Sequence, residues 1–270
     1  MMDQPTSMAA AIAWGQFVEV AYQMYASDKI NPPTPANFPA GWERVANLTM
    51  TPRLELIHER EFAGFIAQSA TDPMQQIVAI RGTESGMDWM SDFEFILETF
   101  HEVPGSGKTE QGFTNLYRSM LVEYADPDSS KPLQQSLLAQ IDTLPAGTKL
   151  VVTGHSLGSS LATLHAFVAA SKGVQTELVT FASPRVGDKA FVEAFQALNM
   201  NQTRVYNEPD IVPKMPIELA GYRHIEPGLS INSTLFPLKH SITCYHALST
   251  YLYVMGDEQA DICKCSKPSA

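Results

Sequence analysis

Apolar residues follow two different spacings along this chain, and the change between them predicts the order of its helices and strands. Between residues 7 and 26 they recur at helical spacing, and Ser7 is placed to cap that helix. Short runs rich in β-branched residues, as at 76–80 and 177–181, instead predict strands. Strand and helix patterns alternate through the second half, which indicates parallel βαβ units. We therefore expect an α/β fold with a central, mostly parallel sheet flanked by helices.

The same patterns give the approximate extent of the other elements. Further strands are predicted at 42–49, 54–59, 63–68 and 204–206, and further helices at 112–125, 132–142, 187–198 and 246–255. We expect one domain over 1–270, in which 1–41 hold the N-terminal helix and a Pro-rich connector and 257–270 form a polar tail.

The segment around Ser156 carries the clearest chemical signal. A strand-like run at 150–153 leads directly into GHSLG at 154–158, which fits G-x-S-x-G, and helical spacing resumes behind it. A strand, a sharp turn and a helix form the context that a nucleophile elbow requires. A serine at such a turn has a strained backbone and needs small neighbours, which Gly154 and Gly158 provide. We interpret Ser156 as the nucleophile of an ester hydrolase.

A serine nucleophile needs a carboxylate that orients its base, and in this fold class the chain order is Ser, then Asp or Glu, then His. Asp210 follows a predicted strand and lies in a turn bounded by Pro209 and Pro213, which would hold it rigid. The alternatives are Asp188, placed to cap a helix, and Glu208, which would face solvent. Asp210 is the predicted acid.

Four histidines downstream of the elbow are candidates for the base. His246 stands just at the predicted start of the last helix, and His240 is its rival. His165 falls within the elbow helix, and His224 lies in an alternating, strand-like stretch, so both suit structural roles. We predict His246 as the base.

The tetrahedral oxyanion of ester hydrolysis requires hydrogen-bond donors. One is the backbone N–H after the nucleophile, at Leu157, and the second comes from a loop after an earlier strand. Thr83 stands in that place, behind the strand at 77–80, and offers a backbone N–H and a hydroxyl. Thr83 and Leu157 are therefore the predicted oxyanion donors.

The stretch directly after this loop has the pattern of an amphipathic helix. Trp89, Phe93, Ile96 and Phe100 fall at i, i+4, i+7 and i+11, on one face. An ordinary core helix is the alternative interpretation. Because the stretch follows the oxyanion loop, we expect residues 84–105 to form a lid that covers the site in water and exposes an apolar rim at a lipid surface.

Composition narrows the classes of partner. The net charge of −11 argues against nucleic acid, and no apolar run is long enough to span a bilayer. The first basic residue is Lys29, so no secretory leader is visible. We expect a cytoplasmic protein, or a secreted one if this is a mature form.

Cysteine usage is sparse, with three residues. This count does not suit a disulfide scaffold, and Cys263 and Cys265 in the polar tail are expected to be free thiols. A disulfide from one of them to another cysteine is the alternative. Neither they nor Cys244 lie in a zinc-ligand pattern, so no metal is expected.

A set of motifs in fixed order resembles the class 3 lipases, the filamentous-fungal-type triacylglycerol lipases with plant and bacterial relatives. The resemblance covers roughly residues 60–255. Its motifs are RGT at 81–83 followed by Asp88, Trp89 and Asp92, GF at 112–113, GHSLG at 154–158, FASPRVG at 181–187, NEPDIVP at 207–213 and HALSTY at 246–251. One departure is Gln111, where family members usually carry His.

The resemblance implies an α/β-hydrolase fold with a helical lid after Thr83, and a family that acts on acylglycerols, phospholipids or simpler esters without a cofactor. It places the triad at Ser156, Asp210 and His246, and the oxyanion hole at Thr83 and Leu157, with Asp92 supporting the threonine.

We expect a serine carboxylester hydrolase, a lipase cleaving triacylglycerols and other fatty-acid esters. The alternatives are a feruloyl-type esterase on short or soluble esters, a phospholipase A1, and a non-catalytic binding module. The expected partner is a lipid or ester substrate met by a monomer, with no nucleic acid, metal or cofactor.

Overall fold

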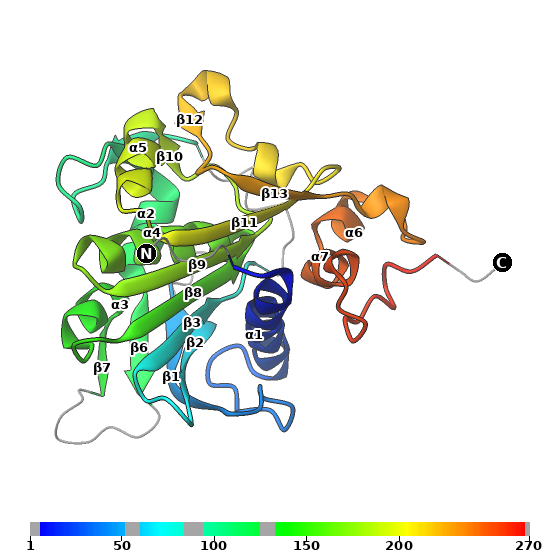
Figure 1. The fold of residues 1–270 in the computed structure, drawn as a ribbon, viewed down its shortest axis with the longest axis horizontal. Coiled ribbons are helices and arrows are strands. Elements are labelled where there is room, and N and C mark those ends of the chain that lie inside the picture. The colour runs from blue at the N-terminus through cyan, green and yellow to red at the C-terminus, as the bar shows by residue number, and fades with distance from the viewer. Residues whose placement is uncertain (1–5, 52–59, 84–93, 125–132, 268–270) are drawn as a thin grey trace.

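The computed structural model describes residues 6–51, 60–83, 94–124 and 133–267, and a twisted central sheet crosses it (Figure 1). Within those residues this sheet has nine strands. Their order is β13 (Gly228–Ile231), β11 (Asn201–Asn207), β9 (Gln175–Phe181), β8 (Lys149–His155), β3 (Gln75–Ile80), β2 (Glu61–Ser69), β1 (Trp42–Met50), β6 (Leu121–Tyr124) and β7 (Gln134–Ser136).

The half of this sheet from β3 to β13 is parallel, and the half from β2 to β7 is antiparallel. Parallel neighbours need crossover connections, and helices supply them. The parallel strands end at the same edge, where β8, β9 and β11 lead into the loops that carry chemistry. The predicted α/β class is therefore confirmed.

Helices cover both faces of the sheet (Figure 1). One layer holds α1 (Met8–Ser27) and α7 (Leu248–Met255), preceded by the short α6 (Ile242–His246). The other layer holds α2 (Gln111–Ser119), α3 (Leu137–Gln140), α4 (Leu157–Ser171) and α5 (Lys189–Ala197). Ser7 accepts the N–H of Ala10 at 3.1 Å, which confirms the predicted cap of α1.

Three predicted helices have the wrong extent, two of them because strand pairing overrides the local pattern. The helix predicted at 112–125 ends at Ser119, after which β6 pairs with β1. The stretch predicted as a helix at 132–142 begins with β7, which pairs with β6. The last helix is broken at Ala247, so His246 ends α6 rather than beginning α7. The strand predicted at 54–59 lies outside the described residues.

The amphipathic helix predicted from Trp89 to Phe100 does not continue through the part that the structure describes. Residues Leu97–Thr99 form β4, which joins β5 (Lys108–Glu110), β10 (Gly187–Asp188) and β12 (Tyr222–Arg223) in a small second sheet. Phe100 is fully buried among aromatic rings, whereas Ile96 is 43% exposed. Phe100 is therefore a core residue, because β4 fixes the chain against β5. Trp89 and Phe93 lie outside the described residues.

The cysteine prediction also needs correction. Cys265 is joined to Cys244 by a disulfide, and only Cys263 is free and exposed. The tail folds back so that the Lys239 N–H donates to the Cys265 carbonyl. This return of the chain brings two thiols 21 residues apart into bonding distance.

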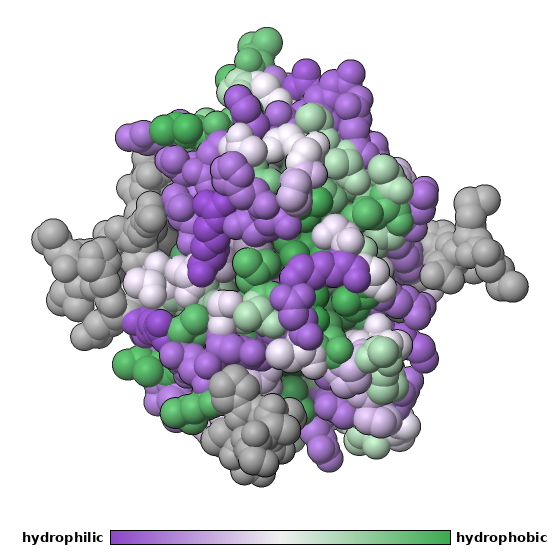
Figure 2. All heavy atoms as spheres, turned by 90° about the vertical axis from the view of Figure 1, so that its left-hand side faces the viewer, coloured by the Kyte–Doolittle hydropathy of each residue, from purple (hydrophilic) through white to green (hydrophobic). Residues whose placement is uncertain are grey.

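No single apolar patch dominates the surface on the side that carries α3 and α5. Figure 2 shows that polar side chains predominate there and that apolar ones lie in separate groups between them. Among the described residues, none of the helices has both the length and the apolar character needed to cross a membrane.

Candidate active site

Ser156 lies in the sharp turn between β8 and α4, and its backbone is strained. Its φ is 57° and its ψ is −128°, a region that residues other than glycine rarely adopt. The two motif glycines permit this turn: a Cβ on Gly154 would lie 2.4 Å from the Gly158 carbonyl oxygen, and one on Gly158 equally close to the Arg81 carbonyl oxygen. The strain and the need for small neighbours were both predicted from the sequence.

The structure joins Ser156, His246 and Asp210 in one hydrogen-bonded chain. His246 Nε2 lies 2.8 Å from Ser156 Oγ, and His246 Nδ1 lies 2.8 Å from Asp210 Oδ2. Because the carboxylate accepts, Nδ1 carries the proton and Nε2 is left to accept from the serine hydroxyl. All three side chains are buried, so water competes little with these bonds.

Asp210 has further partners that hold its orientation. The Tyr251 hydroxyl donates to Oδ2 at 2.7 Å, and the Val212 N–H donates to Oδ1 at 3.0 Å. Burial and the nearby carboxylate raise the pKa of Tyr251, so its hydroxyl remains a donor. The contact of Tyr251 with Asp210 was not predicted, although Tyr251 belongs to the HALSTY motif at 246–251.

The two alternative acids lie elsewhere. Asp188 caps α5 by accepting the Phe191 N–H at 2.9 Å. Glu208 is exposed and accepts from Ser230 and Asn232. Neither contacts His246, so their predicted roles, cap and surface residue, are confirmed.

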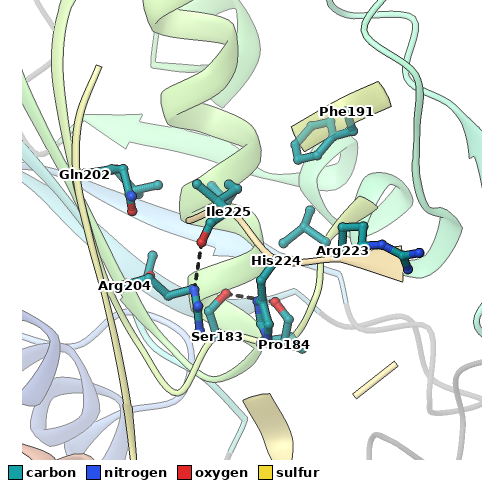
Figure 3. A pocket seen from close by; sticks show the side chains of 12 residues that line it. Ser183, Pro184, Phe191, Gln202, Arg204, Arg223, His224 and Ile225 are labelled. Carbon is teal, nitrogen blue, oxygen red and sulfur yellow. Dashed lines mark hydrogen bonds between the residues drawn. The ribbon is translucent and has the colours of Figure 1, made fainter. Parts of the chain in front are cut away.

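The alternative bases also have other surroundings. His165 is fully buried in α4, where burial lowers its pKa to about 3. His224 lines a small cavity together with Arg204 (Figure 3) and donates from Nε2 to the Pro213 carbonyl at 2.5 Å. His240 is exposed and lies near Lys267.

The predicted oxyanion loop lies against Ser156. A Cβ on Gly82 would lie 3.0 Å from Ser156 Cβ, which shows how closely the two segments approach. Within the part of the chain that the structure describes, the Thr83 hydroxyl oxygen is buried and has no hydrogen-bond partner. Leu157 opens α4, where N–H groups have no acceptor in the helix. Asp92 lies outside the described residues.

A second hydrogen-bonded chain connects this loop to His246. His155 donates from Nε2 to the His246 carbonyl at 2.8 Å, which leaves Nδ1 to accept from the Tyr22 hydroxyl at 2.8 Å. The Tyr22 oxygen in turn accepts the Gly82 N–H at 2.8 Å. Burial, and then the neighbouring His246, hold the pKa of His155 well below its usual value, so the ring is neutral. Tyr22 lies far from these residues in the chain, so no local pattern predicts its role.

The polar side chains at this site form most of their hydrogen bonds with one another. Among the described residues, no group of three or more His, Cys, Asp or Glu side chains is arranged to hold a metal ion. The arrangement suits general-base activation of a serine hydroxyl.

Comparison with known proteins agrees with this geometry. Residues 77–220 match the family described as lipase (class 3). Phospholipase A1-II 3 of Oryza sativa subsp. japonica is 29% identical, covering 74% of this chain and 54% of that protein. Secreted mono- and diacylglycerol lipase 1 of Fusarium solani is 30% identical, covering 61% of this chain and 46% of that protein. The chain spans about half the length of the curated relatives it matches.

Solved structures share the fold. The mono- and diacylglycerol lipase from Aspergillus oryzae superposes with a TM-score of 0.61 at 24% identity, covering 84% of this chain and 81% of that one. The Rhizomucor miehei lipase propeptide complex gives a TM-score of 0.60 at 22% identity, covering 84% and 70%. Both likenesses support the α/β-hydrolase fold. The chain belongs to the class 3 lipase family.

Proposed function

We propose that this protein is a serine carboxylester hydrolase, a lipase that cleaves fatty-acyl esters of glycerol through an acyl-enzyme on Ser156. The observation that carries the proposal is the buried chain from Ser156 Oγ through His246 to Asp210, with 2.8 Å at each step. Such a chain moves a proton between an alcohol and an imidazole, which is what acyl transfer requires.

The first half-reaction forms the acyl-enzyme. His246 Nε2 takes the Ser156 proton as Oγ attacks the ester carbonyl, and Asp210 stabilises the resulting imidazolium. His246 then gives that proton to the leaving alcohol. In the second half, water attacks the acyl-enzyme with His246 again as base, and the fatty acid leaves Ser156 with its hydroxyl restored.

The oxyanion of each tetrahedral intermediate needs donors beside Ser156. We assign the Leu157 N–H, at the positive end of α4, and the N–H and hydroxyl of Thr83. One donor of this kind typically contributes about 3–4 kcal/mol to the transition state.

Phospholipase A1 activity is the second candidate. It is favoured by the relatives from Oryza sativa, which carry that name at 26–31% identity. The Fusarium solani relative, by contrast, is named as a mono- and diacylglycerol lipase.

A lid within 84–105 stays a prediction. The strand β4 and the buried Phe100 limit the part of this segment that could move.

The test is a substrate series with Ser156→Ala as control. p-Nitrophenyl esters of increasing chain length, an emulsified triacylglycerol and phosphatidylcholine vesicles are compared at equal enzyme concentration. Activity on long-chain esters that rises at the emulsion supports a lipase, and release of the sn-1 acyl chain from the vesicles supports phospholipase A1. Activity on short soluble esters alone would contradict both and leave an esterase.

The non-catalytic alternative has its own test. A fluorophosphonate probe should label the wild-type protein once, at Ser156, and should not label Ser156→Ala. A wild-type protein that remains unlabelled and hydrolyses no ester would overturn the proposed function.

A further inference from the structure

Arg81 is a buried arginine at the end of β3, next to the oxyanion loop. Its side chain is 0% exposed and forms an ion pair with Glu61 at 2.7 Å. Its Nε donates to the Phe62 carbonyl at 2.8 Å, and its guanidinium carbon lies 3.4 Å from the centre of the Tyr25 ring. A buried charge destabilises the fold unless it is paired and hydrogen-bonded. These contacts hold the guanidinium plane in one orientation.

The remaining contact of Arg81 goes to the oxyanion loop. Nη1 donates to the Gly82 carbonyl oxygen at 2.6 Å. That carbonyl and the Thr83 N–H belong to one planar peptide unit, which is trans, so they point in opposite directions. Holding the oxygen on the Arg81 side therefore turns the Thr83 N–H away from Arg81.

The loop needs such an anchor because its central residue is glycine. A glycine allows the peptides on both sides to rotate with little steric resistance. No side chain can stiffen this position, since a Cβ on Gly82 would lie 2.5 Å from the Tyr22 hydroxyl and 3.0 Å from Ser156 Cβ. Instead, Tyr22 holds the peptide before Gly82 through its N–H, and Arg81 holds the peptide after it through its carbonyl.

We propose that Arg81 is a positioning residue for ester hydrolysis, whose guanidinium holds the Gly82–Thr83 peptide so that the Thr83 N–H faces the oxyanion. The inference rests on the proposed function and on Thr83 as a donor. A rotated peptide would present a carbonyl oxygen in place of the N–H and would repel the oxyanion. Arg81 therefore acts on the transition state more than on the bound ester.

Arg204 offers a matched control elsewhere in the fold. It is also buried, and its Nε donates to the Ile225 carbonyl at 3.0 Å (Figure 3). It pairs with Glu226 at 3.2 Å. Its guanidinium lies over the Tyr206 ring. Among the described residues, none of its hydrogen bonds reaches the oxyanion loop. Replacing Arg204 therefore also removes hydrogen bonds of a buried guanidinium, but none of those bonds holds the Thr83 peptide.

The experiment compares Arg81→Lys with Arg204→Lys. Lysine keeps the positive charge, but a single ammonium cannot reach all three oxygens that Arg81 binds. Active sites are counted by phosphonate labelling carried to completion, and kcat and KM are measured on p-nitrophenyl butyrate. The affinity of a trifluoromethyl ketone, which forms a tetrahedral adduct with the serine, reports on the oxyanion hole.

For Arg81→Lys we expect kcat per labelled site to fall about 10- to 100-fold. KM should change little, and the Ki of the ketone should rise by about the factor lost in kcat/KM. Arg204→Lys should keep kcat per labelled site within about threefold of wild type. If the two variants have equal kcat and Ki per labelled site, the inference is wrong.

Glu61→Gln provides a second variant should Arg81→Lys not fold. Glu61 is 24% exposed and keeps a carbonyl oxygen after the change, so the fold should tolerate it. A several-fold fall in kcat with a matching rise in the ketone Ki is expected, and unchanged values would overturn the inference. Failure of the proposed function looks different, because the wild-type protein itself would then resist phosphonate labelling.

Discussion

Tyr251 and Asp210 are joined by a buried hydrogen bond that shares an oxygen with the catalytic chain. The Tyr251 hydroxyl lies 2.7 Å from Asp210 Oδ2, the same oxygen that accepts the Nδ1 proton of His246 at 2.8 Å. The Tyr251 oxygen also accepts the Asn207 N–H at 3.0 Å, so its own proton is directed at the carboxylate. Tyr251 thereby holds the orientation of Asp210, the proposed catalytic acid.

Tyr251→Phe should lower kcat/KM by about 10- to 150-fold, because a hydrogen bond to a charged group contributes about 1.5–3 kcal/mol. The ring remains in place, so the fold should hold. Tyr253→Phe, on the same helix and only partly buried, is the control. Equal kcat/KM values for the two variants would show that the Tyr251 hydroxyl has no part in orienting Asp210.

Asp210→Asn should reduce kcat by about 10⁴-fold, because an amide cannot hold the imidazole in the required tautomer. Asp188→Asn should leave kcat within about twofold, since asparagine still caps a helix. Both are measured per labelled active site. A larger loss in Asp188→Asn than in Asp210→Asn would mean that the acid is misassigned.

Glu110 makes stability depend on pH. Its buried carboxyl accepts the Phe113 N–H at 2.7 Å, and burial raises its pKa to about 7. Because the folded pKa lies above the unfolded value of 4.5, this group stabilises the fold below about pH 4.5, and that contribution is lost as pH rises through about 7.

Glu110→Gln should remove the loss of stability that the wild-type protein shows as pH rises. The unfolding free energy of the variant relative to wild type should rise between pH 5 and pH 8, by on the order of 2–3 kcal/mol. Urea unfolding at both pH values measures it, with the exposed Glu193→Gln as control. A pH-independent difference would show that Glu110 is not protonated in the fold.

The disulfide between Cys244 and Cys265 should stabilise the protein by about 3 kcal/mol, since it closes a loop of moderate length. Cys244→Ser should lower the unfolding free energy by that amount. Activity should also fall, because Cys244 lies in the short helix that ends at His246. Cys263→Ser, which alters an exposed free thiol, should change neither quantity. Equal stability of the two variants would refute this role.

Much of the fold and site could be predicted from local pattern. The elbow at 154–158 is a local feature, because strand, glycines, serine and helix are adjacent in the chain. Asp210 and His246 followed from chain order and from turn signals. Local pattern failed where pairing between distant segments decided the structure, as at β4, β6 and β7.

By itself, the sequence determined the position of the G-x-S-x-G turn, the α/β class and the family, and it predicted the members of the proposed catalytic set in their chain order. Only the tertiary structure decided which side chains contact that set. Tyr251 donates a hydrogen bond to Asp210, and Tyr22 and Arg81 form hydrogen bonds with the backbone of Gly82. The tertiary structure also decided that Cys265 forms a disulfide with Cys244. The physical reason is the range of the interactions. Backbone conformation and periodicity depend on neighbours in the chain, whereas a hydrogen bond or a disulfide depends on which groups the packed sheet and helices bring within about 3 Å or less.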